Sequence, residues 1–122
     1  MNEDRSKRVA VIIPAHNEAS RIGDVLKAVT SSHLISEVIV VDDGSKDGTT
    51  QAAAAVSGVR VLTLKRNVGK AAAMAEGVKV TNAPILAFVD ADLGGLKAEH
   101  LDRIIMPLLR DQQPGGVRSE DQ

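Results

Sequence analysis

The sequence predicts an α/β fold, a Rossmann-like parallel β-sheet with helices on both faces. Four short apolar runs rich in Val and Ile recur along its 122 residues, and each is followed by a turn signal and a segment with helical spacing. The runs are nearly continuous rather than alternating, which is typical of strands that are covered on both faces. The resulting βαβαβαβα order implies right-handed crossovers between parallel strands. The four predicted strands are residues 8–13, 37–41, 59–64 and 85–89.

The first predicted strand, RVAVII, is broken by Pro14. The segment that follows carries apolar residues at the i, i+3, i+4 and i+7 spacing of an amphipathic helix. These residues are Ile22, Val25, Leu26 and Val29. The second strand, EVIVV, ends in DDGS, and the alanine-rich segment 47–56 predicts a second helix. Asp47 or Thr49 is the expected N-cap of that helix.

The third predicted strand, VRVLTL, ends in the turn KRNVGK. Residues 69–80 are good helix formers, and the NAP sequence at 82–84 stops that helix. The fourth strand, ILAFV, runs into DADLGG, and a last helix is predicted over about residues 97–110. Its apolar residues at helical spacing are Leu101, Ile104, Ile105 and Leu108.

Composition limits what kind of protein this is. Hydrophobic residues make up 43% of the chain, which is enough for the core of one domain. Lys and Arg total 15 against 16 Asp and Glu, and Phe88 is the single aromatic residue. The chain therefore lacks the basic excess and the stacking platforms of nucleic-acid binders. The absence of Cys excludes disulfides and thiolate metal sites.

The expected organisation is a charged N-terminal lead (residues 1–7), one domain (residues 8–110) and a polar, disordered tail (residues 111–122). The first apolar run is too short for a membrane span, and it lacks the cleavage region of a signal peptide. We therefore expect a cytoplasmic protein.

Polar residues collect after every predicted strand, and ligands of open parallel sheets bind beyond the carboxyl ends of the strands. Turns of α/β proteins are polar in any case, but four clusters at one edge favour a binding site. Asn17 and Glu18 carry groups suited to a base or ribose, and His16 beside them is a candidate ligand contact. Of Asp42 and Asp43, one is expected to cap the turn and the other to face the crevice. The clusters are PAHNE (14–18), DDGS (42–45), RNVGK (66–70) and DAD (90–92).

Asp90 and Asp92 lie two residues apart, so in an extended segment they share one side. Two neighbouring carboxylates repel each other, and a cation between them relieves the repulsion. Their oxygens suit Mg²⁺ or Mn²⁺ beside a diphosphate. Gly69 allows the backbone to approach a ligand, and Lys70 at the start of a helix suits a phosphate.

Four segments of the chain, taken in order, resemble motifs of the inverting glycosyltransferases of family 2; they are VIIPAHNE, VIVVDDGSKDGT, RNVGKAAAMAEGV and FVDADL. The resemblance covers residues 8 to about 93 and implies the nucleotide-diphospho-sugar-binding (GT-A) fold with a divalent metal, Mg²⁺ or Mn²⁺. It makes Asp92 the direct metal ligand and Asp90 a ribose-binding or water-mediated partner. The candidate nucleotide-sugar-binding residues are then Pro14, Ala15, Asn17, Glu18, Asp43, Gly69, Lys70, Asp90, Ala91 and Asp92.

The family that the chain resembles continues well past this D-x-D pair, with further strands that hold the acceptor and a carboxylate base. We find no candidate for that base, because Glu99, Asp102 and Asp111 belong to the last predicted helix and its end. We therefore expect a fold truncated after the D-x-D motif, in a fragment of a longer protein. A complete small protein working as a dimer is the alternative. If the fourth strand lies beside the first, it is an edge strand that a second subunit would cover.

The leading interpretation is a glycosyltransferase that binds a nucleotide-diphospho-sugar and transfers the sugar to an acceptor hydroxyl with inversion. A UDP-sugar is preferred over a GDP-sugar as the donor, and the acceptor stays open. A catalytically incomplete donor-binding module is the alternative. A phospho-receiver domain has a similar length and paired acids, but its acids follow the first strand, where this chain has PAHNE. Nucleotidyltransferases share the broad fold, but their Gly-rich loop after the first strand is absent here.

Overall fold

The computed structural model describes residues 8–93 and 95–111. The expected lead (1–7) and all but the first residue of the expected tail lie outside the described residues. Four parallel strands form one sheet in the order β3-β2-β1-β4. The strands are β1 (Val9–Ala15), β2 (Glu37–Asp42), β3 (Val59–Thr63) and β4 (Ile85–Phe88). The helices are α1 (Ile22–Thr30), α2 (Thr49–Ala54), α3 (Lys70–Val78) and α4 (Ala98–Asp111).

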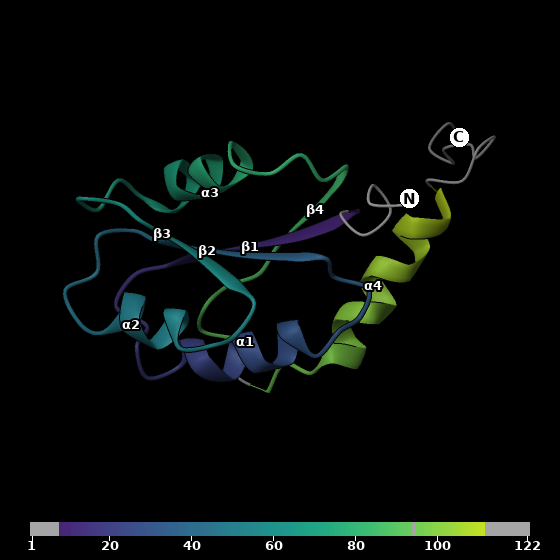
Figure 1. Cartoon of the computed structure of the whole chain (residues 1–122), viewed down its shortest axis with the longest axis horizontal. Helices are drawn as coiled ribbons and strands as arrows, with labels where there is room; N and C mark the ends of the chain where they lie inside the picture. The colour runs from purple at the N-terminus through teal and green to yellow at the C-terminus, as the bar shows by residue number, and fades with distance from the viewer. Residues whose placement is uncertain (1–7, 94, 112–122) are drawn as a thin grey trace.

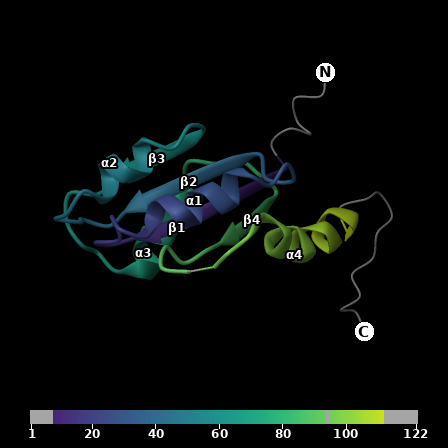
Figure 2. The same cartoon turned by 90° about the horizontal axis from the view of Figure 1, so that it is seen from below.

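Helices cover both faces of the sheet (Figure 1). α1, α2 and α4 pack on one face, and α3 packs on the other. Figure 2, seen from the side of α1, places α4 beyond the end of α1 and next to β4. The predicted α/β fold with helices on both faces is confirmed, and the fourth strand lies beside the first at an edge of the sheet.

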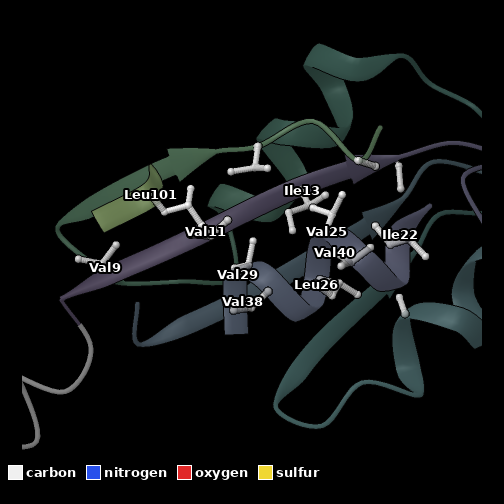
Figure 3. Packing of buried hydrophobic residues seen from close by; sticks show 14 of the residues in the cluster. Val9, Val11, Ile13, Ile22, Val25, Leu26, Val29, Val38, Val40 and Leu101 are labelled. Atoms are coloured by element: carbon white, nitrogen blue, oxygen red, sulfur yellow. The ribbon is translucent and has the colours of Figure 1, made fainter. Parts of the chain in front are cut away.

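Side chains of β1 alternate between two apolar cores. Val9, Val11 and Ile13 point toward α1, where they meet one apolar side of that helix (Figure 3). The residues of α1 on this side are Ile22, Val25, Leu26 and Val29. Ile12 belongs to the opposite core, together with Ile39 of β2 and Ala73 of α3. Every residue of β1 is buried, which explains why its sequence is continuously apolar.

Pro14 does not end the first strand as predicted; it lies inside β1 and is paired in register with Val41 of β2. Successive residues of a strand direct their backbone groups to opposite neighbours. The carbonyl of Ala15 accepts from Asp43 on the β2 side, and the carbonyl of Ile12 accepts from Val89 on the β4 side. The hydrogen that Pro14 lacks would therefore point toward β4, whose pairing with β1 has already stopped at Ile12. The proline costs no ladder hydrogen bond there.

Helix boundaries also differ from the prediction, and α3 ends at Val78, before the NAP sequence at 82–84. α2 has Gly48 at its N-cap position rather than Asp47 or Thr49, although a carboxylate oxygen of Asp47 accepts from the backbone N–H of Thr49 at 3.0 Å. Asp111, expected to begin the tail, is the last residue of α4.

α4 buries fewer of its apolar residues than their helical spacing predicts. Leu101 and Ile105 are buried in the core with α1, but Ile104 is 64% exposed and Leu108 is 41% exposed. The reason is that α4 lies at the end of α1 rather than across the sheet, so only one edge of its apolar side reaches the core (Figure 2). Among residues 8–93 and 95–111, no helix is long and apolar enough to cross a membrane.

Candidate functional site

A cavity of about 300 Å³ opens where all four strand-end segments meet. Parallel strands end at the same edge of a sheet, so residues far apart in sequence converge there. The cavity is lined by every predicted site residue except Asn17, and His16 and Asn67 join them. The lining residues are Pro14, Ala15, His16, Glu18, Asp43, Asn67, Gly69, Lys70, Asp90, Ala91 and Asp92.

Asp42, the last residue of β2, and Asp43, which follows it, have the two different roles that were expected. Asp42 caps the turn, because one of its oxygens accepts from the backbone N–H of Ser45 at 2.9 Å and the other from the Thr50 hydroxyl at 2.5 Å. Asp43 lines the cavity. Between the acids and Ser45, Gly44 has φ +71°, and a Cβ there would lie 2.5 Å from the backbone of Arg66. Glycine therefore lets the loops after β2 and β3 touch.

The carboxylate of Asp43 holds the loop after β3. Its Oδ1 accepts from the N–H of Val68 at 2.7 Å, and its Oδ2 accepts from the N–H of Gly69 at 3.0 Å. The Asn67 side-chain amide donates to the same Oδ2 at 3.1 Å. Asp43 is only 3% exposed, and a buried carboxylate needs hydrogen-bond donors from the protein. The loop after β3 supplies them to both oxygens. The sequence pointed to the RNVGK cluster but gave no sign that Asn67 reaches Asp43.

Asn17 is used to build the wall of the site rather than to line it. Its φ of +54° lies in the left-handed region that Asn tolerates, and its N–H donates to Ser45 Oγ at 2.8 Å. Its Oδ1 accepts from the N–H of Lys46 at 2.8 Å. These bonds fix the loop after β1 to the loop after β2.

The His16 ring lies between the backbone of Asp43 and the side-chain amides of Asn17 and Asn67. Its Nδ1 lies 2.8 Å from the carbonyl oxygen of Asp43, and because a carbonyl only accepts, Nδ1 carries the proton. The Nε2 then accepts from the Asn17 amide at 3.3 Å. The ring is thereby oriented at the wall of the cavity.

Asp47 and Thr49 tie the loop after β1 to the start of α2. The N–H of Glu18 donates to Thr49 Oγ1 at 2.9 Å, and the N–H of Ala19 donates to Asp47 Oδ2 at 3.2 Å. The hydrogen bond from the Thr49 hydroxyl is the main reason that the pKa of Asp47 lies below its usual value. The Glu18 carboxylate itself pairs with Arg21 at 2.8 Å.

The charged end of the cavity is formed by Lys70, Asp90 and Asp92. Lys70 begins α3, and its Nζ lies 2.5 Å from Asp90 Oδ1. The hydrogen bond and charge of Asp90, with a smaller contribution from the charge of Asp92, raise the pKa of the Lys70 ammonium. The ammonium group of Lys70 is thus a positive charge placed directly beside the paired acids.

Asp90 and Asp92 also have the chemistry to bind a divalent cation that prefers oxygen ligands. In the described part of the chain, no group of three or more His, Cys, Asp or Glu side chains is placed to hold a metal ion. Asp90 and Asp92 supply carboxylate oxygens only, which suit Mg²⁺ or Mn²⁺, and Mg²⁺ is commonly bound by one or two carboxylates plus substrate phosphates. The chemistry of these two carboxylates therefore fits Mg²⁺ or Mn²⁺.

None of residues 98–110 of α4 lines the cavity. Asp102, on α4, accepts from the Ser32 hydroxyl at 2.5 Å and so ties this helix to the end of α1. α4 lies toward the amino ends of the strands, away from the cavity (Figure 1).

Comparison with known proteins identifies relatives of one kind. The model of the family described as "Glycosyl transferase family 2" matches residues 10–111. The undecaprenyl-phosphate 4-deoxy-4-formamido-L-arabinose transferase of Aeromonas hydrophila is 38% identical over 102 residues, which are 76% of this chain and 31% of that protein. The glycosyltransferase AglE of Haloferax volcanii is 41% identical over 91 residues, 69% of this chain and 30% of that protein. The chain thus spans about a third of the length of these relatives.

The solved structures that are similar to this chain include a sugar transferase. Glucosyl-3-phosphoglycerate synthase from Mycobacterium tuberculosis, in complex with Mn²⁺, UDP and glucosyl-3-phosphoglycerate, superposes with a TM-score of 0.75 at 30% identity. The match covers 84% of this chain and 40% of the synthase. The complex of the same enzyme with Mn²⁺, UDP-glucose and phosphoglyceric acid gives a TM-score of 0.76 over 87% of this chain and 41% of the synthase.

Proposed function

Since the chain belongs to glycosyltransferase family 2, we propose that it binds a nucleotide-diphospho-sugar together with a divalent cation, as the donor-binding part of a sugar transferase. The reaction proposed for the whole enzyme is transfer of the sugar to an acceptor hydroxyl with inversion. UDP is the proposed nucleotide, with GDP as the alternative, and Mn²⁺ or Mg²⁺ is the proposed cation. The solved relative bound to UDP and Mn²⁺ supports these choices.

The observation that carries the proposal is the charge pattern of a single cavity. Its lining includes the ammonium of Lys70 paired with Asp90, the neighbouring Asp92, and the end of β1 with the loop that follows it. A diphosphate needs a cation and positive side chains, whereas a nucleoside needs a flat apolar wall with a few polar groups. Pro14 and Ala15 offer that wall, and Glu18 and His16 offer polar groups beside it.

Each residue at the charged end has a proposed task. Asp92 holds the cation directly, and Asp90 binds the ribose or reaches the cation through water. Lys70 donates to the diphosphate oxygens and thereby favours their negative charge. When bound, the cation supplies Lewis-acid stabilisation to the diphosphate leaving group.

A donor-binding module without transfer is the second candidate. It is favoured by the fact that three of the four carboxylates of the cavity already have partners: Glu18 pairs with Arg21, Asp43 with the loop after β3, and Asp90 with Lys70. The fourth, Asp92, has the proposed task of holding the cation. Release of UDP from UDP-glucose in the presence of acceptors separates the candidates, because a module binds the donor and releases no UDP.

The proposal is tested by isothermal titration calorimetry of UDP binding with Mn²⁺ present. We expect Asp92→Asn, which keeps the shape of the side chain and removes its charge, to weaken UDP binding by about tenfold or more. Chelation of Mn²⁺ should weaken binding to the wild-type chain to the same degree. Asp24→Asn, at an exposed position of α1, is the matched control and should bind as wild type does. Equal affinity of wild type and Asp92→Asn would contradict the proposal.

A further inference from the structure

The ion pair between Lys70 and Asp90 differs from the other ion pairs in the described part of the chain. Arg21–Glu18 and Lys79–Glu76 join residues three positions apart, so local chain geometry brings them together. The Lys70–Asp90 pair joins the start of α3 to the segment after β4, and both residues line the cavity. It is also the shortest of the three, at 2.5 Å.

This pair occupies the position that a cation needs. Asp90 accepts from the Lys70 ammonium through Oδ1, and Asp92 contributes a second negative charge nearby. A divalent cation brought to these two acids would face the ammonium at close range, and like charges repel. A cation held by Asp92 and the Lys70 ammonium paired with Asp90 therefore compete for the negative charge of the two neighbouring acids.

The competition is reversible because both partners reach solvent. The Lys70 side chain is 62% exposed and the Asp90 side chain is 50% exposed. Exposed ion pairs are weak, so a ligand can break this one at small cost. A diphosphate in the cavity would offer the ammonium several anionic oxygens in place of one carboxylate.

We infer that Lys70 is a positioning residue that exchanges partners, holding Asp90 in the ligand-free chain and the diphosphate in the complex. This inference rests on the proposed function. Its consequence is that Lys70 disfavours metal binding in the absence of nucleotide and favours binding of the nucleotide–metal pair. Coupling between two ligands is reciprocal, so the nucleotide raises the affinity for the cation as much as the cation raises the affinity for the nucleotide.

The test uses Lys70→Met, which keeps the length of the side chain and removes its charge. Binding of Mn²⁺ alone is measured from the electron paramagnetic resonance signal of free Mn²⁺, and UDP binding is measured by calorimetry at saturating Mn²⁺. We expect two opposite changes, each of about fivefold. The Kd for Mn²⁺ alone falls, and the Kd for UDP rises. Lys70→Arg should restore both constants toward the wild-type values.

Lys79→Met is the matched control, because Lys79 lies just after the same helix and its ammonium pairs with Glu76 at 3.1 Å. It should leave both constants unchanged. If Lys70→Met binds Mn²⁺ alone no more tightly than the wild type, or binds UDP equally well, the exchange of partners is wrong while the proposed function stands. If the wild-type chain binds neither Mn²⁺ nor UDP, the proposed function fails and the inference fails with it.

Discussion

Asp43 shows how one buried carboxylate shapes the cavity. Its oxygens accept from the backbone N–H groups of Val68 and Gly69 and from the side chain of Asn67. Its backbone carbonyl accepts from His16. Asp43 therefore connects the segments that follow β1, β2 and β3, and the wall of the cavity depends on it whether or not it touches a ligand.

Asp43→Ala should destabilise the chain by about 2 kcal/mol, because two backbone N–H groups lose a charged acceptor. Urea-induced unfolding followed by circular dichroism measures the change in the free energy of unfolding. Asp24→Ala, on the exposed side of α1, serves as the control and should change that free energy by no more than about 0.5 kcal/mol. Equal stability of the two variants would refute the anchoring role of Asp43.

At the level of elements, α3 depends on a glycine for its approach to the sheet. A Cβ at Gly77 would lie 2.6 Å from Cγ2 of Ile12 and 3.2 Å from Cγ2 of Val41. Ile12 is fully buried in the centre of β1, so it cannot move aside easily. The close packing that places Lys70 at the cavity therefore rests on the missing side chain of Gly77.

Gly77→Ala should destabilise the chain by about 1–3 kcal/mol through overpacking, although alanine is the better helix former. Gly23→Ala in α1 is the matched control, since nothing lies within 4 Å of the added Cβ. That change should stabilise the chain by about 0.5–1 kcal/mol. Thermal unfolding of both variants measures whether each substitution lowers or raises the stability of the chain. A gain in stability for Gly77→Ala would show that α3 is less tightly packed than described here.

The elements that the sequence predicted well are those set by local pattern. The four strands and four helices follow from apolar runs and helical spacing, and their order along the chain is correct. Beyond helix boundaries, the errors concern Pro14 and the exposed side of α4, and each of these depends on a distant neighbour. Pro14 fits inside β1 because β4 has ended beside it, and Ile104 stays exposed because α4 meets only the end of α1. Neither fact is visible in a window of sequence.

Across the whole molecule, the sequence predicted which segments meet, but not which side chains form hydrogen bonds or ion pairs with one another. Parallel strands end at one edge, so PAHNE, DDGS, RNVGK and DAD had to lie together, and nine of the ten candidate residues line one cavity. The partners within that cavity join residues 20 or more positions apart, as with Lys70 and Asp90. Such pairs depend on three-dimensional placement, which is why the pairing of Lys70 with Asp90 was not predicted.

The central claim is that a divalent cation held by the acids after β4 binds the diphosphate of a nucleotide. Crystals grown with Mn²⁺ and UDP, measured for the anomalous scattering of manganese, test it most directly. We predict an anomalous peak within about 2.5 Å of a carboxylate oxygen of Asp92, with the UDP diphosphate on its other side. Bound UDP with no manganese peak at this position, or with the peak elsewhere in the molecule, would contradict the claim.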